Sequence, residues 1–232
     1  MIKKALVVAL GSVLLTACGT TAIMKKSAAI QAQPEMVIKT DGDFWGLGQE
    51  GTFDIAGIYT GKYSRNASGS AWFNALETNN GEMAAEITRV DGKETWHLIC
   101  SGKTQRLNIA SFSFDNSKPY KCQILQNNKQ VGSYEMSQAS SGPIAIGIER
   151  KEIGEVSIAK KQLRVTSIHE TDSTFIPLER ALGYSLTKDN REVAAVQTNG
   201  MLTLQMLPEL SPAERDLVAV AAIASALSWR PE

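Results

Sequence analysis

The segment of residues 211–229 constrains the fold of this chain more than any other. It begins with Ser211, which can cap the first amides, then a proline suited to the first helical position, then Glu214 three residues after the cap, an order typical of a capping box. From Leu217 to Leu227 only Ser225 is polar, so the predicted helix has no polar face, as is typical of a helix enclosed on all sides. This apolar part is well short of the roughly 20 residues that a bilayer requires. We therefore predict a buried core helix.

The residues before this helix follow the period-two pattern of strands. Ile144, Ile146 and Ile148 alternate with small or charged residues, as in half-buried strands. Three dipeptides favoured in type I′ hairpin turns lie between such segments, namely Asn80-Gly81, Asp91-Gly92 and Asn199-Gly200. The predicted strands are residues 53–59, 71–77, 82–90, 94–100, 106–114, 120–125, 130–136, 144–149, 153–158, 162–168, 181–187, 191–197 and 201–207. We expect their pairing to be mostly antiparallel.

About a dozen strands followed by one apolar helix is a distinctive order of elements. A sheet of that many strands curls, splits or closes, and a closed barrel of that size has a lumen too wide for its own side chains to fill. The final helix is the segment that can fill it. We predict a mainly β fold, an antiparallel barrel of about twelve strands that encloses the C-terminal helix, within one domain of residues 51–232. The alternatives are a lipocalin-like barrel or a β-sandwich with an external helix, which should then show a polar face.

This order of elements, together with the apolar sequence DLVAVAAIASALSW that ends the helix, resembles the tubby-like barrel superfamily. That superfamily includes the LURP-one-related proteins and the phospholipid scramblases. The resemblance covers roughly residues 51–229 and implies a barrel of about twelve strands around a hydrophobic C-terminal helix. No phosphoinositide-binding or calcium-binding motif of that group is found here, so the resemblance assigns no binding residue.

The first residues have the pattern of a signal peptide. Residues 1–4 are positively charged and residues 5–15 are apolar, over a length typical of secretion. The next residues, Leu15-Thr16-Ala17-Cys18, resemble the lipobox of bacterial lipoproteins. That resemblance implies a signal peptide of residues 1–17, cleavage before Cys18 and acyl chains on Cys18 that hold the protein to a bilayer. The alternative is ordinary secretion, with cleavage after Gly19 and loss of Cys18.

The residue after Cys18 and the charge balance bear on location and partners. In enteric-type lipoproteins an aspartate after the lipidated cysteine is typical of inner-membrane retention, so Gly19 favours the outer membrane, facing the periplasm. Residues 18–50 have little periodicity, and we predict a lipidated N-terminus and a flexible tether that lets the domain stand off the membrane. The chain has 24 basic and 24 acidic residues, which excludes the clustered basic excess typical of nucleic-acid binding.

Two cysteines remain beyond Cys18, and we expect them to form a disulfide. Cys100 and Cys122 each lie on an apolar face of a predicted strand, so the two thiols can meet inside the sheet. An oxidising compartment favours this bridge. The alternative is a redox or metal pair, although the spacing is neither CxxC nor a zinc pattern.

The sequence contains several apparent site motifs that lack the required context. Residues 46–51 spell GxGxxG, but no strand precedes them and no helix follows. Residues 102–104 resemble the end of a P-loop without its first glycine, and Ser68 and Ser101 lie in no GxSxG elbow. His97 and His169 are the only histidines and have no companion ligands. We therefore predict no catalytic residue, no metal and no cofactor.

The expected function is non-enzymatic. We expect a lipid-anchored envelope protein with a structural, partner-binding or lipid-binding role, whose partners are the membrane and an envelope protein or lipid. The alternatives are a lipid-handling protein, as the scramblase resemblance implies, or a hydrolase. Basic pairs such as Lys160-Lys161 could contact anionic head groups, although charged turns are usually only solvated. The hydrolase alternative would require the fold to bring a serine or a carboxylate pair together with a base in one cleft.

Overall fold

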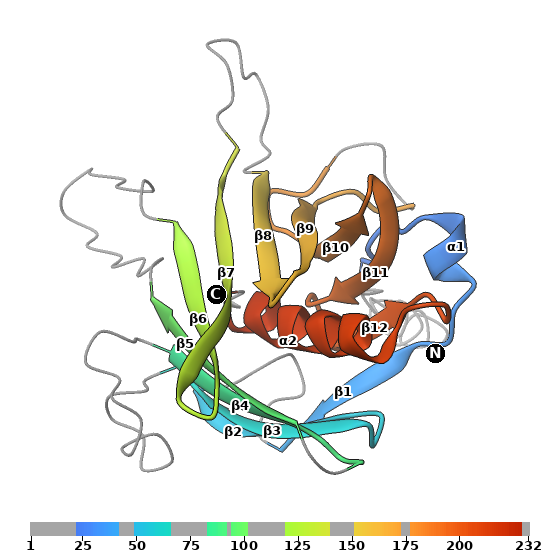
Figure 1. Cartoon of the computed structure of the whole chain (residues 1–232). Coiled ribbons are helices and arrows are strands. Elements are labelled where there is room, and N and C mark those ends of the chain that lie inside the picture. The colour runs from blue at the N-terminus through green and yellow to red at the C-terminus, as the bar shows by residue number, and fades with distance from the viewer. Residues whose placement is uncertain are drawn as a thin grey trace, which may run out of the picture.

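The period-two segments pair into one closed antiparallel barrel of twelve strands, in sequence order, with β1 closing the ring between β2 and β12 (Figure 1). This computed structural model describes residues 22–41, 49–65, 83–91, 94–101, 119–139, 151–172 and 177–228. The strands are β1 (Met36–Thr40), β2 (Glu50–Ile55), β3 (Tyr59–Ser64), β4 (Met83–Arg89), β5 (Thr95–Ser101), β6 (Tyr120–Gln126), β7 (Lys129–Gln138), β8 (Glu152–Ile158), β9 (Lys161–Ile168), β10 (Gly183–Lys188), β11 (Arg191–Gln197) and β12 (Thr203–Met206). The helices are α1 (Ala28–Gln31) and α2 (Pro212–Ser228).

The two ends of the barrel differ in their connections. At one end, which we call the hairpin end, two-residue turns join β6 to β7, β8 to β9 and β10 to β11. Both turn residues have positive φ at Asn127-Asn128 and at Asp189-Asn190, as type I′ turns require. At the other end, which we call the long-connection end, longer segments join β1 to β2, β9 to β10 and β11 to β12. Helix α2 begins at the hairpin end and runs through the lumen toward the long-connection end.

Helix α2 fills the barrel, as the sequence predicts. Every residue from Leu217 to Leu227 is at most 1% exposed, and the helix contacts β4 and β8 to β12 (Figure 1). A helix buried on every face cannot lie outside the sheet, so the lipocalin-like and sandwich alternatives are wrong. The predicted start is also correct, because α2 begins directly after Ser211 and Glu214 accepts from the Ser211 amide at 2.9 Å, which is the glutamate half of a capping box.

Two strands, β1 and β3, were not predicted from the sequence. The segment predicted as one strand at residues 53–59 is divided by a turn, because Ala56 and Gly57 both have positive φ, and Tyr59 begins β3 instead of ending β2. Strand β1 lies in the segment predicted to be a tether. Three predicted strands, at residues 71–77, 106–114 and 144–149, lie outside the described residues.

The tether prediction is therefore wrong for the described residues between 22 and 50. Ile38 in β1 is 3% exposed and pairs with Ile55 of β2, so β1 contributes to the core as well as to the sheet. The physical reason is closure, because without β1 the edges of β2 and β12 would have unpaired backbone groups. The barrel thus begins at Met36 and not at residue 51.

The disulfide prediction is confirmed. Cys100 of β5 and Cys122 of β6 face each other in register, with their Cα atoms 4.0 Å apart, and form a disulfide. Both residues are at most 2% exposed and belong to the hydrophobic core. The bridge therefore joins two neighbouring strands from inside the barrel.

Candidate functional site

The lumen contains polar side chains, and the hydroxyls of four tyrosines form hydrogen bonds to the helix, namely Tyr59, Tyr120, Tyr134 and Tyr184. Tyr120 donates its hydroxyl to the Ala224 carbonyl at 3.2 Å, and the Tyr134 hydroxyl lies 2.9 Å from Ser225 Oγ. Burial raises the pKa of Tyr134 above its usual range. These hydroxyls are therefore neutral hydrogen-bonding groups that fix the helix against β6 and β7.

The C-terminal turn of α2 has its carbonyl groups satisfied by side chains. The guanidinium of Arg65 donates to the Leu227 carbonyl at 2.7 Å and to the Ala226 carbonyl at 3.0 Å. Ser228 Oγ donates to the Ser225 carbonyl at 2.7 Å. These groups are the ones that a helix end leaves without intrahelical partners, and a cation there also complements the helix dipole. Arg65 thus acts as a cap of the helix.

The N-terminal turn of α2 is fixed by ion pairs. Asp216, 6% exposed, accepts from Arg89 Nη1 at 2.8 Å and from the Tyr59 hydroxyl at 2.9 Å. Glu214 accepts from Lys188 Nζ at 2.7 Å. The hydrogen bond from Lys188, followed by those from Ser211, lowers the pKa of Glu214 to about 2. The polar groups of the lumen named above are therefore engaged by the helix.

A groove of about 560 Å³ lies on the outer face of β1 to β4. Among its charged groups, Lys62 pairs with Glu86, and Asp41 is bound by Thr52. Asp41 accepts from the Thr52 amide at 2.7 Å and from its hydroxyl at 2.8 Å, and these bonds lower the pKa of Asp41. Glu86 lies 3.6 Å from Lys62 Nζ and 3.1 Å from His97 Nε2. The groove is lined by Lys39, Thr40, Asp41, Thr52, Phe53, Asp54, Thr60, Gly61, Lys62, Glu86 and Thr88.

A second hollow, of about 480 Å³, lies at the hairpin end beside the start of α2. The basic residues that line it are Lys160, Lys161, Arg164 and Lys188, and the acidic ones are Glu155, Asp189 and Glu214. Glu214 pairs with Lys188 at 2.7 Å and lies 4.0 Å from Lys161. The predicted basic pair at 160–161 therefore belongs to a mixed-charge hollow and not to a uniformly basic patch.

One serine lies beside a histidine. Ser167 Oγ is 3.0 Å from His169 Nε2, and His169 Nδ1 is 2.9 Å from the Leu178 carbonyl. Because a carbonyl only accepts, Nδ1 carries a proton, and in a neutral ring Nε2 accepts from the serine. Sequence reasoning missed this pair, although residues two apart on a strand share a face. Both residues are buried, at 1% and 3% exposed, and neither lines either of the two cavities described above.

The predicted lipidation residue and most of the apparent motifs that lack the required context lie outside the described part of the chain. Cys18, Ser68 and residues 46–48 and 102–104 lie outside it, whereas Ser101 is the exposed last residue of β5. In the residues that the structure describes, no three His, Cys, Asp or Glu side chains are grouped as a metal site requires. Within the same ranges no helix combines the length and the hydropathy needed to cross a bilayer.

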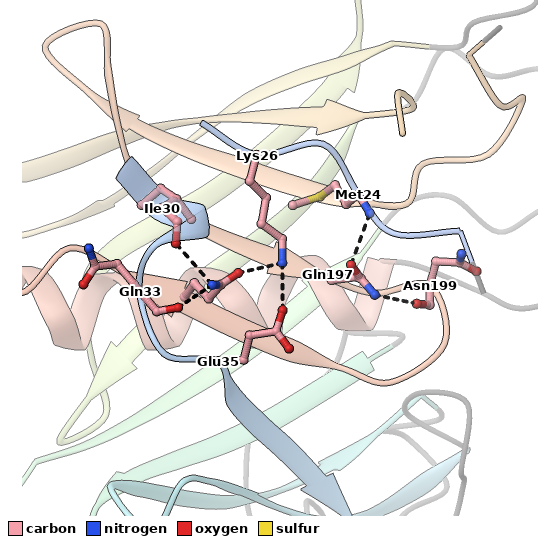
Figure 2. A network of polar contacts seen from close by, with 8 residues as sticks. Met24, Lys26, Ile30, Gln33, Glu35, Gln197 and Asn199 are labelled. Atoms are coloured by element: carbon pink, nitrogen blue, oxygen red, sulfur yellow. Dashed lines mark hydrogen bonds and ion pairs between the residues drawn. The ribbon is translucent and has the colours of Figure 1, made fainter. Parts of the chain in front are cut away.

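The outer face of β10 to β12 is covered by residues 22–35, which we call the N-terminal arm. Lys26 Nζ donates to Gln205 Oε1 at 2.6 Å and lies 3.2 Å from Glu35 Oε1 (Figure 2). Gln205 Nε2 donates to the carbonyls of Ile30 at 3.2 Å and Gln33 at 2.6 Å. Gln205 is 3% exposed and the side chain of Lys26 is 5% exposed. The arm is thus bound to the barrel by a buried polar network.

The start of the arm also lies tightly against the sheet. Met24 forms an isolated bridge with Thr171 and donates its amide to Gln197 Oε1 at 3.2 Å (Figure 2). A Cβ atom at Gly183 would lie 2.5 Å from Met24 Sδ and 2.2 Å from the Val196 carbonyl oxygen. Glycine at this position therefore permits the close approach of the arm and of β11.

The sequence matches no protein-family model, and comparison with curated proteins and with solved structures finds no similar protein. The observed architecture is a closed twelve-strand antiparallel barrel with a C-terminal helix. No family is therefore assigned, and the resemblance to the tubby-like superfamily stays a prediction.

Proposed function

We propose that this chain is a lipid-anchored envelope protein, without catalytic activity, whose barrel is a rigid module that binds a partner through its outer surface. The observation that supports this proposal is the filled lumen. Val220 and Ile223 are fully buried at the centre of the barrel, and the ends of α2 are fixed by Arg65 and Glu214. We therefore place the partner-binding surface on the outside of the barrel.

The proposal places the anchor at Cys18, on the outer membrane facing the periplasm. Its support is the lipobox sequence at residues 15–18 together with the disulfide between Cys100 and Cys122, because such bridges persist in oxidising compartments. Several acyl chains on one residue would anchor the protein firmly, since each buried methylene contributes about 0.8 kcal/mol.

The filled lumen gives less support to the lipid-handling alternative. A carrier needs a cavity for acyl chains, whereas the lumen side chains of α2 pack directly against the strands. Contact between lipid and the outer surface of the barrel is not affected by this argument. Among the described residues, hydrolysis has only the buried pair of Ser167 and His169 in its favour.

The anchor is tested by metabolic labelling with a palmitate analogue and by membrane fractionation. We expect label in the parent protein and in Thr20→Ala, and neither label nor membrane retention in Cys18→Ser. Label that persists in Cys18→Ser, or a parent protein that is unlabelled and soluble, would contradict the anchor.

Partner binding is tested by crosslinking in intact envelopes with two matched variants. Thr60→Arg places a long side chain in the groove over β1 to β4, whereas Ser133→Arg changes an exposed residue of β7. We expect a protein adduct with the parent and with Ser133→Arg that is lost in Thr60→Arg. Identical adducts in both variants would move the binding surface elsewhere, and no adduct with the parent protein would refute partner binding.

A further inference from the structure

The described part of the N-terminal arm starts at the long-connection end of the barrel. The Ala22 carbonyl accepts from Asn199 Nδ2 at 3.2 Å, and Asn199 belongs to the connection between β11 and β12. The bridge between Met24 and Thr171 lies just after the end of β9. The chain therefore approaches the barrel from this end before it runs along β11 and β12 toward α1.

The distance between this end and the proposed anchor is limited by covalent geometry. Cys18 precedes Ala22 by four residues. A chain extends at most 3.3–3.6 Å per residue, so the two Cα atoms are at most about 14 Å apart in any conformation. Because Ala22, Met24 and Lys26 are all bonded to the barrel, the arm cannot act as a long tether. The long-connection end must then lie close to the bilayer that holds the acyl chains.

The same end carries exposed apolar side chains. Ile23 is 62% exposed, Met201 is 55% exposed and Leu178 is 37% exposed. Met201 lies in the connection between β11 and β12, and Leu178 lies in the connection between β9 and β10, where its amide donates to the His169 carbonyl at 2.9 Å. These three residues come from the arm and from the two connections nearest to its start. We call them the apolar rim.

We propose that the apolar rim, formed by Ile23, Leu178 and Met201, contacts the lipid bilayer to which Cys18 is anchored, so that the long-connection end of the barrel faces the membrane. This inference rests on the proposed lipid anchor and adds an orientation and a contact surface to it. Apolar side chains at the level of the head groups remove surface from water without crossing the bilayer, as in other interfacial contacts.

The hairpin end faces away from the membrane in this arrangement. A seven-residue strand such as β8 extends about 23 Å. The hairpin end is therefore farther from the bilayer than the long-connection end, which the arm keeps close to it. It carries the mixed-charge hollow that contains Lys160 and Lys188. It also carries two exposed apolar residues, Ile58 at 46% and Val90 at 52%, which are matched controls for the apolar rim.

The test uses the full-length lipidated protein in vesicles of phosphatidylethanolamine and phosphatidylglycerol with brominated acyl chains. Tryptophan is introduced singly as Ile23→Trp, Met201→Trp, Ile58→Trp or Val90→Trp, and the fluorescence of the parent protein is subtracted. We expect the bromine atoms to quench the added fluorescence several-fold more at positions 23 and 201 than at positions 58 and 90. Flotation of the vesicles reports the anchor separately.

The possible outcomes separate the contact from the anchor. Equal quenching at both ends, or stronger quenching at positions 58 and 90, in protein that floats with the vesicles would overturn the orientation and leave the anchor intact. Protein that does not float would overturn both. A variant with a ten-residue Gly-Ser spacer between Thr21 and Ala22 is expected to float normally and to lose part of the quenching at positions 23 and 201, because the longer chain no longer limits the distance. Undiminished quenching in the spacer variant would show that the rim binds lipid without help from the tether, which still supports the contact.

Discussion

Lys26 and Gln205 are 179 residues apart in the sequence, and Lys26 Nζ donates to Gln205 Oε1 at 2.6 Å. Gln205 in turn donates to the carbonyls of Ile30 and Gln33. A single amide side chain on the outer face of β12 thus serves a buried ammonium and two backbone carbonyls of the N-terminal arm. The arm is therefore a part of the folded domain.

Gln205→Ala tests how firmly this network holds the arm. The variant removes one partner from the nearly buried Lys26 ammonium, which keeps Glu35, and one from each of the carbonyls of Ile30 and Gln33. Each buried polar group that is left unsatisfied costs about 1–3 kcal/mol. We expect faster hydrogen exchange at the amides of the arm, Met24 included, while β6 and β7 keep their protection. Lys25→Ala, at an exposed position, is the control. Unchanged exchange in the arm of Gln205→Ala would show that Met24 and its contacts hold the arm without the network.

The helix and ten of the twelve described strands could be predicted from the sequence because their signals are local. The apolar run after Asp216 has only one residue with a polar side chain before Ser228, and a period-two pattern needs only neighbouring residues. The covering of β10 to β12 by the arm is a long-range relationship. One local pattern in β11 is consistent with this covering. The segment of residues 193–196 is apolar throughout and does not alternate with polar residues, which is typical of a strand covered on both faces.

Turn chemistry explains the errors in the strand boundaries. Asn199-Gly200 was expected to form a two-residue turn, but it lies within a five-residue connection in which Gly200, and not Asn199, has positive φ. Among the described residues three pairs have positive φ at both positions, and two of them, Asn127-Asn128 and Asp189-Asn190, lack glycine, whereas the third is Ala56-Gly57. Asparagine and aspartate tolerate this region through local hydrogen bonds, so a search for glycine pairs alone misses these turns. The spacing of Ser167 and His169 places them on one face, but the contact of His169 Nδ1 with the Leu178 carbonyl nine residues away is not predicted by a local pattern.

The contact between Tyr134 and Ser225 should stabilise the position of α2 in the lumen. Tyr134→Phe and Ser225→Ala each remove one side of a buried hydrogen bond of 2.9 Å. We expect each single variant to lower the free energy of unfolding by about 1–2 kcal/mol, and the double variant to lower it by less than the sum. Urea unfolding of the four proteins gives the coupling, and Ser137→Ala, exposed on β7, is the control. Strict additivity would mean that the two hydroxyls do not interact.

We expect the disulfide to stabilise the barrel, and we expect the twelve strands to assemble without it. Cys100 and Cys122 are separated by 22 residues, and closing a loop of that size stabilises by about 3 kcal/mol on the chain-entropy model. Urea unfolding with and without a reductant measures this contribution. Because no cysteine is substituted, the volume of the core side chains does not change. A midpoint that does not respond to the reductant, in protein whose thiols have become titratable, would contradict the expectation.

The ion pair between Glu214 and Lys188 at the start of α2 should make the stability of the protein fall at acidic pH. The folded-state pKa of Glu214 is lowered from 4.5 to about 2, mainly by the hydrogen bond from Lys188, so the folded state favours the ionised carboxylate. Its contribution is fully present above pH 4.5 and is lost as the pH falls toward 2. We expect the Tm of Glu214→Gln to fall less than that of the parent protein between these pH values. Glu209→Gln, in an exposed ion pair, should follow the parent, and a parallel decline in all three proteins would exclude this role for Glu214.

Ala222→Asp tests the enclosed helix and the proposed anchor together. Ala222 is fully buried in the middle of α2, and an unpaired buried carboxylate costs several kcal/mol, which is comparable to the total stability of a domain. We expect the variant to lose protease resistance and near-ultraviolet dichroism while it stays in the membrane fraction through Cys18. Ala29→Asp, at an exposed position of α1, should remain folded and membrane-bound. If Ala222→Asp is instead folded but released from the membrane, then α2 contributes to membrane attachment and its enclosed position in the barrel is wrong.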